Sequence, residues 1–229
     1  MNELWLKARL YYEMFGHKDV LSEYHHACLS AIENLITQTP LMAIDLAMTG
    51  LDPQQDQIIS IGIVPIEAGN IPLSIPLAKA QQIMINIDGS VGQSAAVHGI
   101  VDNHLSSALT LEKAMEWFIE QTKGHILLAH HAPMDVGFLQ SHLAKTYNRT
   151  IKLPFIDTLA LEKQRLLRQH DVLKEGSLRL DACRQRYGLP TYSGHDALTD
   201  ALACAELFAA QVNAIGDINQ LSASEFISI

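Results

Sequence analysis

The sequence has few of the features that would place it in a membrane or in an oxidising compartment. No apolar run approaches the roughly 18 residues that a membrane-spanning helix needs, and charges interrupt the first turns, so we expect neither a transmembrane helix nor a secretory signal. Its three cysteines, Cys28, Cys183 and Cys204, are far apart and form no Cys-x-x-Cys pair. This pattern excludes a disulfide framework and a zinc ribbon, so we expect a cytoplasmic location and no membrane partner.

Positive charge is also scarce. Lys and Arg number 16 against 25 Asp and Glu, which gives a formal net charge of −9. This balance argues against a protein that holds nucleic acid by bulk positive charge alone. Seven of the bases nevertheless lie between Leu161 and Arg186, where a solvated helix face and a phosphate-binding surface are both open interpretations.

What is present is a chain of 229 residues, 48% of them hydrophobic, which is enough for one large domain with an appendage. Apolar residues at helical spacing predict two helices within 1–38, separated near Gly16, and Pro40 ends that segment. Short apolar runs at 41–47, 57–66 and 81–87 then predict strands, after which helical and strand-like stretches alternate. We expect an α/β fold with a mixed sheet flanked by helices, divided into an N-terminal helical extension (1–39), a main domain (40–215) and a C-terminal tail (216–229).

Three acidic residues occupy positions that are unusual for surface charges. Asp45 lies in the apolar strand 41–47, where a charge is costly to bury unless it is paired or binds a metal. Asp135 lies in the first turn of a predicted helix, where favourable interaction with the helix dipole is an equally good explanation. Asp200 lies within an alanine-rich helix and has no basic neighbour in the sequence.

His195 precedes Asp200 by five residues. Within one helix this spacing would separate the two side chains by roughly 140°. They can converge only if His195 lies in the loop before the helix, with Ser193 or Asp196 as the N-cap.

The three carboxylates lie on a predicted strand, at the start of a predicted helix and within a later helix. Together they could bind a hard divalent cation. Mg²⁺ and Mn²⁺ prefer oxygen ligands, and a two-metal site activates a water molecule and stabilises both oxygens of a phosphodiester displacement. A histidine with an ordinary pKa near 6.5 could take the proton from that water. The sequence therefore predicts a hydrolytic site for phosphodiesters, with two divalent cations as cofactors.

Three segments together resemble the motifs of a known family, the DEDDh 3′–5′ exonucleases of the ribonuclease H-like fold, which includes the epsilon proofreading subunit of DNA polymerase III. AIDLAMTGLD resembles the first motif, AHHAPMDVGFL the second, and HDALTDA the third, in which the histidine stands five residues before the last aspartate. The resemblance covers about residues 40–212 in the family's order. It implies a five-stranded mixed sheet, with Asp45, Asp135 and Asp200 as metal ligands and His195 as the catalytic base.

Two positions depart from the family pattern. His131 stands where the family often has Asn, and Ala47 stands where it has a glutamate ligand. Alanine removes one oxygen ligand and one negative charge, so we expect weaker metal binding and slower turnover. Two explanations are open: an inactivated form of a working nuclease, or a natural pseudo-enzyme that binds strands without cutting them.

The resemblance also implies a substrate and its contacts. A single-stranded 3′ end of DNA or RNA would enter the site and release nucleoside 5′-monophosphates. The helices within 1–38 could serve as a lid, as a cover for the core, which we favour, or as a surface for a protein partner. A non-catalytic strand-binding or scaffold module on the same fold is the alternative, and a mostly helical His-Asp phosphohydrolase is a third. The substrate-binding residues that the resemblance implies are Thr49, Gly50, Leu51, His98, Ile100 and Phe138.

Overall fold

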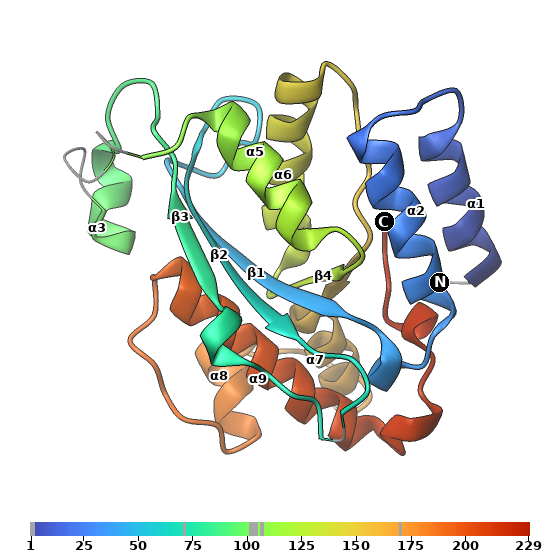
Figure 1. The fold of residues 1–229 in the computed structure, drawn as a ribbon. Helices are drawn as coiled ribbons and strands as arrows, with labels where there is room; N and C mark the ends of the chain where they lie inside the picture. The colour runs from blue at the N-terminus through green and yellow to red at the C-terminus, as the bar shows by residue number, and fades with distance from the viewer. Residues whose placement is uncertain (1–2, 71, 101–104, 106–107, 170) are drawn as a thin grey trace.

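The structure, a computed structural model, describes residues 3–70, 72–100, 105, 108–169 and 171–229. The first two residues of the predicted N-terminal extension therefore lie outside the described residues. A five-stranded sheet with the order β3-β2-β1-β4-β5 forms the centre of the fold (Figure 1). Strand β2 is antiparallel to β1 and β3, whereas β4 and β5 run parallel to β1 and to each other. The strands are β1 (Leu41–Met48), β2 (Ile58–Ile66), β3 (Gln81–Met84), β4 (Ile126–Ala129) and β5 (Phe155–Asp157).

Helices cover both faces of this sheet. In Figure 1, α5 (Leu111–Thr122) and α6 (Ala132–Tyr147) lie above it, and α7 (Thr158–Leu167), α8 (Leu180–Arg186) and α9 (Ala197–Ile215) lie below it. Because helices cover both faces, β2 is buried along its whole length. Its sequence is therefore mostly apolar and β-branched and does not alternate between apolar and polar residues. The α/β class and the mixed five-stranded sheet are confirmed. The short helix α3 (Ala95–His98) projects at the edge of the molecule.

The two predicted N-terminal helices are α1 (Glu3–Met14) and α2 (Val20–Glu33), and Gly16 between them has a left-handed backbone with φ 77°. Asp19 caps α2 by accepting a hydrogen bond from the Ser22 backbone N–H, and Arg149 Nη1 donates to the same carboxylate at 2.7 Å. Leu6, Leu10 and other buried residues of these helices belong to the hydrophobic cluster that also contains the sheet. The extension therefore shares the core of the main domain.

The C-terminal tail contains the 3₁₀ turns Ile218–Gln220 and Ala223–Glu225 and returns to the body of the molecule. Ser222 forms an antiparallel bridge with Leu35 after α2, and Ser228 forms another with Phe155 of β5. The C-terminus accordingly lies beside α2 in Figure 1. The tail joins the N-terminal extension to the last strand of the sheet.

Two predicted strands are shorter than the sequence indicated. The run 81–87 is a strand only to Met84, after which Ile85 forms an isolated bridge with Leu109. The strand-like stretch HILLAHH, residues 125–131, is a strand only from Ile126 to Ala129, because His131 adopts a left-handed backbone with φ 73° and begins the turn into α6. No helix in the described part of the chain is long and apolar enough to cross a membrane. The proposed division at 39 and 215 stays a prediction.

Candidate active site

One cleft of about 570 Å³ lies at the end of β1. It joins the strand end, the turn after it, the short helix α3 and the loop before α9. Most of the predicted site residues line it, although they are separated by up to 155 positions in the sequence, from Asp45 to Asp200. The predicted residues in this lining are Asp45, Ala47, Thr49, Gly50, Leu51, His98, His195 and Asp200.

Asp45 and Ala47 lie on the same face of β1 because side chains alternate along a strand. Asp45 pairs with Gly62 of β2, and Ala47 pairs with Ser60. The Ala47 side chain also belongs to a small apolar cluster under the cleft, with Ile59 and Val91 among its members. The position of the family's glutamate thus faces the cleft but is bordered by hydrophobic side chains.

The turn after β1 is held by Asp56, a residue that the sequence did not single out. Its carboxylate accepts hydrogen bonds from Thr49 Oγ1 at 3.2 Å and from the Asp52 backbone N–H at 2.9 Å. A Cβ atom at Gly50 would lie 2.4 Å from an Asp56 carboxylate oxygen. Glycine is therefore required at position 50 for the turn to close over this carboxylate, which shapes one rim of the cleft.

Asp135 lies in the first turn of α6, as predicted, and is only 5% exposed. The turn before it is fixed by Asp157, whose carboxylate accepts hydrogen bonds from the backbone N–H groups of His131 at 2.9 Å and Leu159 at 3.0 Å. Asp157 thus has the structural role expected of an acid at a strand-to-helix junction. His130 is also structural, because its ring bonds Thr158 Oγ1 and the Leu178 carbonyl, both at 2.8 Å.

His195 lies in the loop before α9, and Asp196 is the N-cap of that helix, as one sequence interpretation required. The His195 backbone N–H donates to Asp200 Oδ2 at 2.8 Å, and His195 has a left-handed φ of 76°. This bond bends the loop so that a histidine and an aspartate five residues apart line the same cleft. The His195 side chain is exposed at the mouth.

Burial, and to a smaller extent repulsion between carboxylates, disfavours the charged forms of the three aspartates. Burial raises the pKa of Asp45 well above its ordinary value, and the nearby carboxylates of Asp135, Asp200 and Asp196 raise it further. Burial also raises the pKa of Asp135 to about 7. The pKa of Asp200 is raised by burial in the same way, partly offset by the hydrogen bond from His195. Among the causes of these shifts, His195 beside Asp200 is the only cationic side chain, and no Lys or Arg of the described residues contributes.

This donor set fits a divalent cation. Carboxylate oxygens are the ligands that Mg²⁺ and Mn²⁺ prefer, and a cation would relieve the repulsion between the three aspartates. In the part of the chain that the structure describes, no three His, Cys, Asp or Glu side chains converge closely enough to hold one ion. Ala47 lines the same cleft as Asp45 and Asp200 and offers no ligand, so the set is one carboxylate short of the family motif.

His98 is held in a fixed orientation by two hydrogen bonds. Its Nδ1 accepts from the Ile100 backbone N–H at 3.1 Å, so Nε2 of the neutral ring carries the proton and lies 3.0 Å from Ser94 Oγ. Burial lowers the pKa of His98, which favours the neutral ring. Ser94 also lines the cleft, although the sequence analysis missed it. Its position one helical turn before His98 was the available signal.

Two predicted substrate-binding residues do not line the cleft. Ile100 is buried in the apolar cluster next to Ala47. Phe138 is fully buried in the main core and stacks on His142 with ring centroids 6.1 Å apart. Its expected contact with substrate is corrected to a packing role, because a side chain enclosed by the core has no exposed face to offer.

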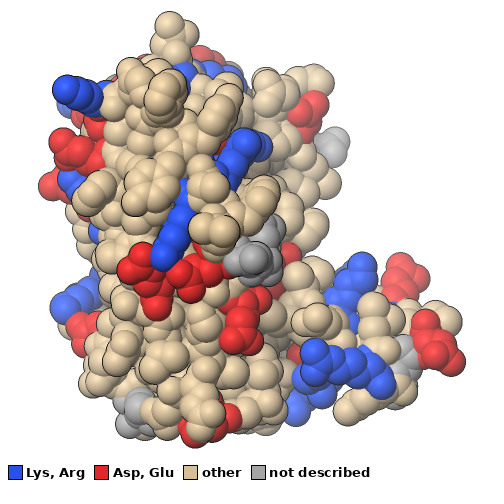
Figure 2. Space-filling view, turned by 90° about the vertical axis from the view of Figure 1, so that its right-hand side faces the viewer, with Lys and Arg blue, Asp and Glu red and all other residues tan. Residues whose placement is uncertain are grey.

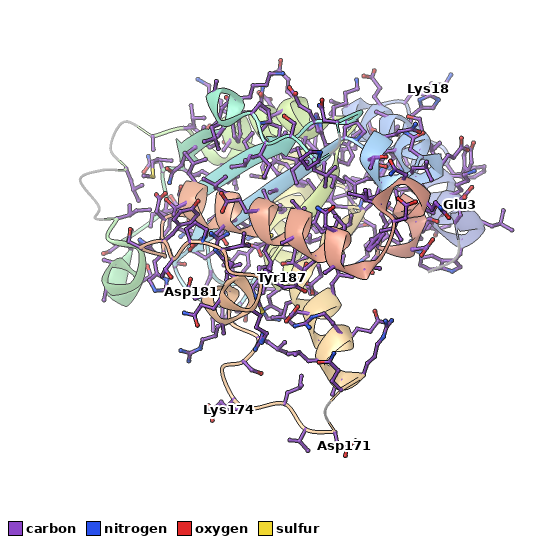
Figure 3. The ribbon with its side chains drawn as sticks, turned by 90° about the horizontal axis from the view of Figure 1, so that it is seen from below. Glu3, Lys18, Asp171, Lys174, Asp181 and Tyr187 are labelled. Atoms are coloured by element: carbon purple, nitrogen blue, oxygen red, sulfur yellow. The ribbon has the colours of Figure 1, made fainter. Side chains whose placement is uncertain are left out.

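The basic segment between Leu161 and Arg186 is only in part a charged surface. Arg165 and Arg186 both bind the fully buried Glu162, and Arg184 is buried against Glu206 and two backbone carbonyls. Lys174 lies with Asp171 on a loop that projects away from the body (Figure 3). Three of the seven bases therefore stabilise the packing of α7, α8 and α9. These three are not available for a phosphate-binding surface.

Comparison with known proteins gives matches over this same region. A family model described as "Exonuclease" matches residues 42–208. The chain is 32% identical over 168 residues to the PolC-type DNA polymerase III of Thermotoga petrophila, covering 73% of this chain but only 11% of that protein. It is 26% identical to the DNA polymerase III subunit epsilon of Treponema pallidum, covering 74% of this chain and 75% of that one.

The fold is also that of solved nucleases. The nuclease domain of 3′hExo, a DEDDh family member bound to rAMP, superposes with a TM-score of 0.63 at 15% identity, covering 77% of this chain and 92% of that one. The fold and the carboxylate cluster thus define a nuclease domain of the ribonuclease H-like class. The chain belongs to the DEDDh 3′–5′ exonuclease family, with alanine in place of one acidic ligand.

Proposed function

We propose that this protein is a metal-dependent 3′–5′ exonuclease that removes nucleoside 5′-monophosphates from single-stranded 3′ ends, and that Ala47 weakens it. The observation that carries the proposal is a group of three aspartates with raised pKa values. Asp45 and Asp200 line the cleft with the exposed His195, and the buried Asp135 lies close enough to Asp45 to raise its pKa. Such crowding destabilises a fold, so it is best explained by a bound cation.

In this proposal Asp45, Asp135 and Asp200 hold two divalent cations, Mg²⁺ or Mn²⁺. When bound, the cations neutralise the scissile phosphate and lower the pKa of a water molecule. His195, on the loop at the cleft mouth, takes the proton from the attacking water, and its exposure leaves the ring free to approach the substrate. The Thr49-Gly50 backbone contacts the terminal nucleotide, and the fixed ring of His98 lies near its base.

The second candidate is a module that binds strands without cutting them. Ala47 favours it, because the cleft lacks a carboxylate on the side where the family has one. A His-Asp phosphohydrolase is excluded, since that interpretation required a mostly helical protein and a five-stranded sheet is present. A cytoplasmic location stays a prediction, supported by three free buried cysteines.

The test is to restore the missing ligand. Ala47→Glu and the matched Ala47→Gln, which adds similar bulk without charge, are incubated with 3′- and 5′-labelled oligonucleotides of DNA and RNA plus Mg²⁺ or Mn²⁺. We expect EDTA-sensitive shortening from the 3′ end with Ala47→Glu, at least 100-fold slower shortening with Ala47→Gln, and loss on adding His195→Ala. Oligonucleotide binding without any hydrolysis by Ala47→Glu would support the strand-binding module instead.

A further inference from the structure

Two further hollows lie outside the active-site cleft. The first, about 630 Å³, lies along the outer face of α6 and is called the α6 groove here; its lining includes Gln54, Gly137, Ser141, Lys145, Thr150 and Lys152. The second, about 470 Å³, lies at the C-terminal end of α1 and is called the α1 pocket; its lining includes Arg9, Tyr12, Phe15, His17, Arg149 and Lys152. The residues 150–152 line both hollows, so the two are adjacent.

One turn of the chain separates the α6 groove from the active-site cleft. Gly50 and Leu51 line the cleft, and Gln54, four residues after Gly50 in the same turn, lines the groove. Pro53 of this turn rests on Gly137 of α6, where an added Cβ atom would lie 3.6 Å from Pro53 Cγ. A chain that leaves the cleft over this turn therefore reaches the groove directly. The part of α6 that lines the groove runs from Gly137 to Lys145, about 12 Å at 1.5 Å per residue, so the groove extends beyond a single nucleotide.

The charge of the groove differs from that of the protein as a whole. Its lining includes Lys145 and Lys152 and no acidic residue, although the chain has a net charge of −9. Both lysines are exposed, and among the described residues neither forms a salt bridge; Lys152 Nζ contacts only the Gln140 amide oxygen at 3.4 Å. Unpaired ammonium groups beside amide and hydroxyl groups suit the phosphates of a nucleic-acid backbone.

The α1 pocket adds exposed aromatic rings. Tyr12 and Phe15 are 70% and 84% exposed. Arg9 lies over the Tyr12 ring at 5.5 Å and pairs at 3.3 Å with Glu13, which also lines the pocket, so the pocket contributes rings and not free positive charge. Arg149 is not available for a ligand, because Asp19 and the Glu13 carbonyl occupy it. In Figure 2, which views this side of the molecule, Lys and Arg side chains lie singly or in small groups, several of them beside Asp and Glu side chains. Stacking on exposed rings with sparse positive charge is typical of sequence-independent binding to single strands.

We propose that the α6 groove and the α1 pocket bind the part of a single-stranded nucleic acid that lies upstream of the 3′ end in the active site. Phosphates contact Lys145 and Lys152, and unpaired bases stack on Tyr12 and Phe15. The N-terminal extension thereby becomes part of the substrate site, outside the region 42–208 that matches the family. This inference rests on the proposed function, because it requires a 3′ end in the cleft.

The test compares short and long strands. Binding of 5′-labelled oligo(dT) and oligo(U) of 4 and 16 nucleotides to the Ala47 protein is measured by fluorescence anisotropy in Mg²⁺ at several salt concentrations. The groove variant is Lys145→Gln/Lys152→Gln, the pocket variant Tyr12→Ala/Phe15→Ala, and the matched control Lys163→Gln/Lys174→Gln, which removes two exposed bases from the segment between Leu161 and Arg186. All six positions are exposed, so folding should be unaffected.

We expect the 16-mer to bind more tightly than the 4-mer, and the groove variant to lose about tenfold on the 16-mer but nothing on the 4-mer. The slope of log affinity against log salt should fall by about 1.4, since each phosphate contact on a single strand contributes about 0.7. The pocket variant should weaken the 16-mer with an unchanged slope, and the control should match the parent. The proposal would be overturned if the groove variant weakened binding of the 4-mer and the 16-mer equally. It would also be overturned if the control variant bound the 16-mer more weakly than the parent.

The same variants in the Ala47→Glu background separate this inference from the proposed function. If the groove variant shortens a 4-mer at the parent rate and a 16-mer more slowly than the parent, the result supports both the proposed function and the groove. If the groove variant shortens both lengths at the parent rate, the proposed role of the groove is wrong and the proposed function stands. No binding of either oligonucleotide together with no hydrolysis by Ala47→Glu would overturn both.

Discussion

The backbone carbonyl of Ala197 lies where a side chain on Gly62 would begin: a Cβ atom at Gly62 would be 2.4 Å from it. Gly62 pairs with Asp45 across the sheet, and Ala197 is the first residue of α9. The missing side chain thus lets the start of α9 rest directly on β2, next to the strand that carries Asp45. The approach brings Asp200 and His195 into the same cleft as Asp45.

Gly62→Ala should therefore damage both stability and the site. Backbone atoms cannot move aside as a flexible side chain can, so we expect a loss of about 3 kcal/mol in the free energy of unfolding, at the upper end for overpacked cores. Urea unfolding measures this, and nuclease activity should also fall in the Ala47→Glu background. Gly137→Ala is the control: its Cβ would make an ordinary 3.6 Å contact, and we expect a gain of about 0.5–1 kcal/mol in helix stability. Unchanged stability for Gly62→Ala would contradict the close contact.

Removing one carboxylate from the aspartate cluster should stabilise the metal-free protein. Asp45→Asn removes a carboxyl group whose ionised form is destabilised by burial and by the nearby Asp135 and Asp200, so we expect a higher Tm in EDTA. The parent should gain several degrees on addition of Mn²⁺, because a ligand that binds only the folded state stabilises it. Asp45→Asn should lose most of that gain, whereas the exposed control Asp171→Asn should keep it. Differential scanning fluorimetry with and without Mn²⁺ measures these Tm values. If Mn²⁺ raised the Tm of Asp45→Asn as much as that of the parent, Asp45 would be excluded as a ligand.

The attachment of the N-terminal helices should depend on pH through Asp19. Burial raises the pKa of this carboxyl, but hydrogen bonds from Arg149 and Ser22 outweigh that effect and lower it to about 2. A lowered folded-state pKa contributes stability above the unfolded value of about 4, and the contribution is lost as the pH falls toward 2. Asn remains a good N-cap, so Asp19→Asn isolates the charge and should cost about 1 kcal/mol at pH 6.5.

Urea unfolding of the parent and Asp19→Asn at pH 6.5, 4 and 3 tests this pH dependence. The difference between the two proteins should shrink from pH 4 to pH 3. Arg149→Gln should show a similar loss, and the double variant should lose less than the sum of the single variants. Additive losses, or a difference independent of pH, would mean that the pair contributes nothing to the attachment.

The ion cluster around Glu162 should be a main source of stability for α7 and α8. Glu162 is fully buried and accepts from Arg165 at 2.6 Å, Arg186 at 3.1 Å and Tyr187 Oη at 2.9 Å. Glu162→Gln should cost about 3 kcal/mol, the low end for a broken buried ion pair, because both arginines are partly exposed and can be hydrated. Tyr187→Phe, which removes one hydrogen bond, should cost about 1 kcal/mol. Urea unfolding measures both, and equal losses would argue against an ionic contribution.

The sequence predicted those parts of the molecule that depend on local pattern. The β-branched run of β2 and the alanine-rich stripe of α9 each indicate one kind of element, and the spacing of His195 and Asp200 could be satisfied only by a loop followed by a helix. Chain topology then brings the ends of β1, α6 and α9 together, so Asp45, His195 and Asp200 were predicted to share a site. That Asp135 lies buried beside them follows from the same arrangement.

Other features depend on contacts between distant segments and could not be read from local pattern. Nothing near Asp56 in the sequence shows that its carboxylate packs on Gly50, and nothing near Arg184 shows that it is buried against α9. The left-handed backbone of His131 is stabilised by Asp157, which lies 26 residues further along the chain. Phe138 was assigned to substrate by its motif, but the packing of α6 on the sheet places its ring in the core.

The bridge between Ser228 and Phe155 has a consequence for how the chain can be shortened. β5 is the last strand of the sheet, and an unprotected last strand presents free N–H and C=O groups on which other chains can pair. The Ser228 backbone occupies both hydrogen-bonding groups of Phe155, at 2.8 Å each. A fragment limited to residues 42–208 would expose this strand and should form intermolecular β-sheet and aggregate, even though it contains every carboxylate of the site.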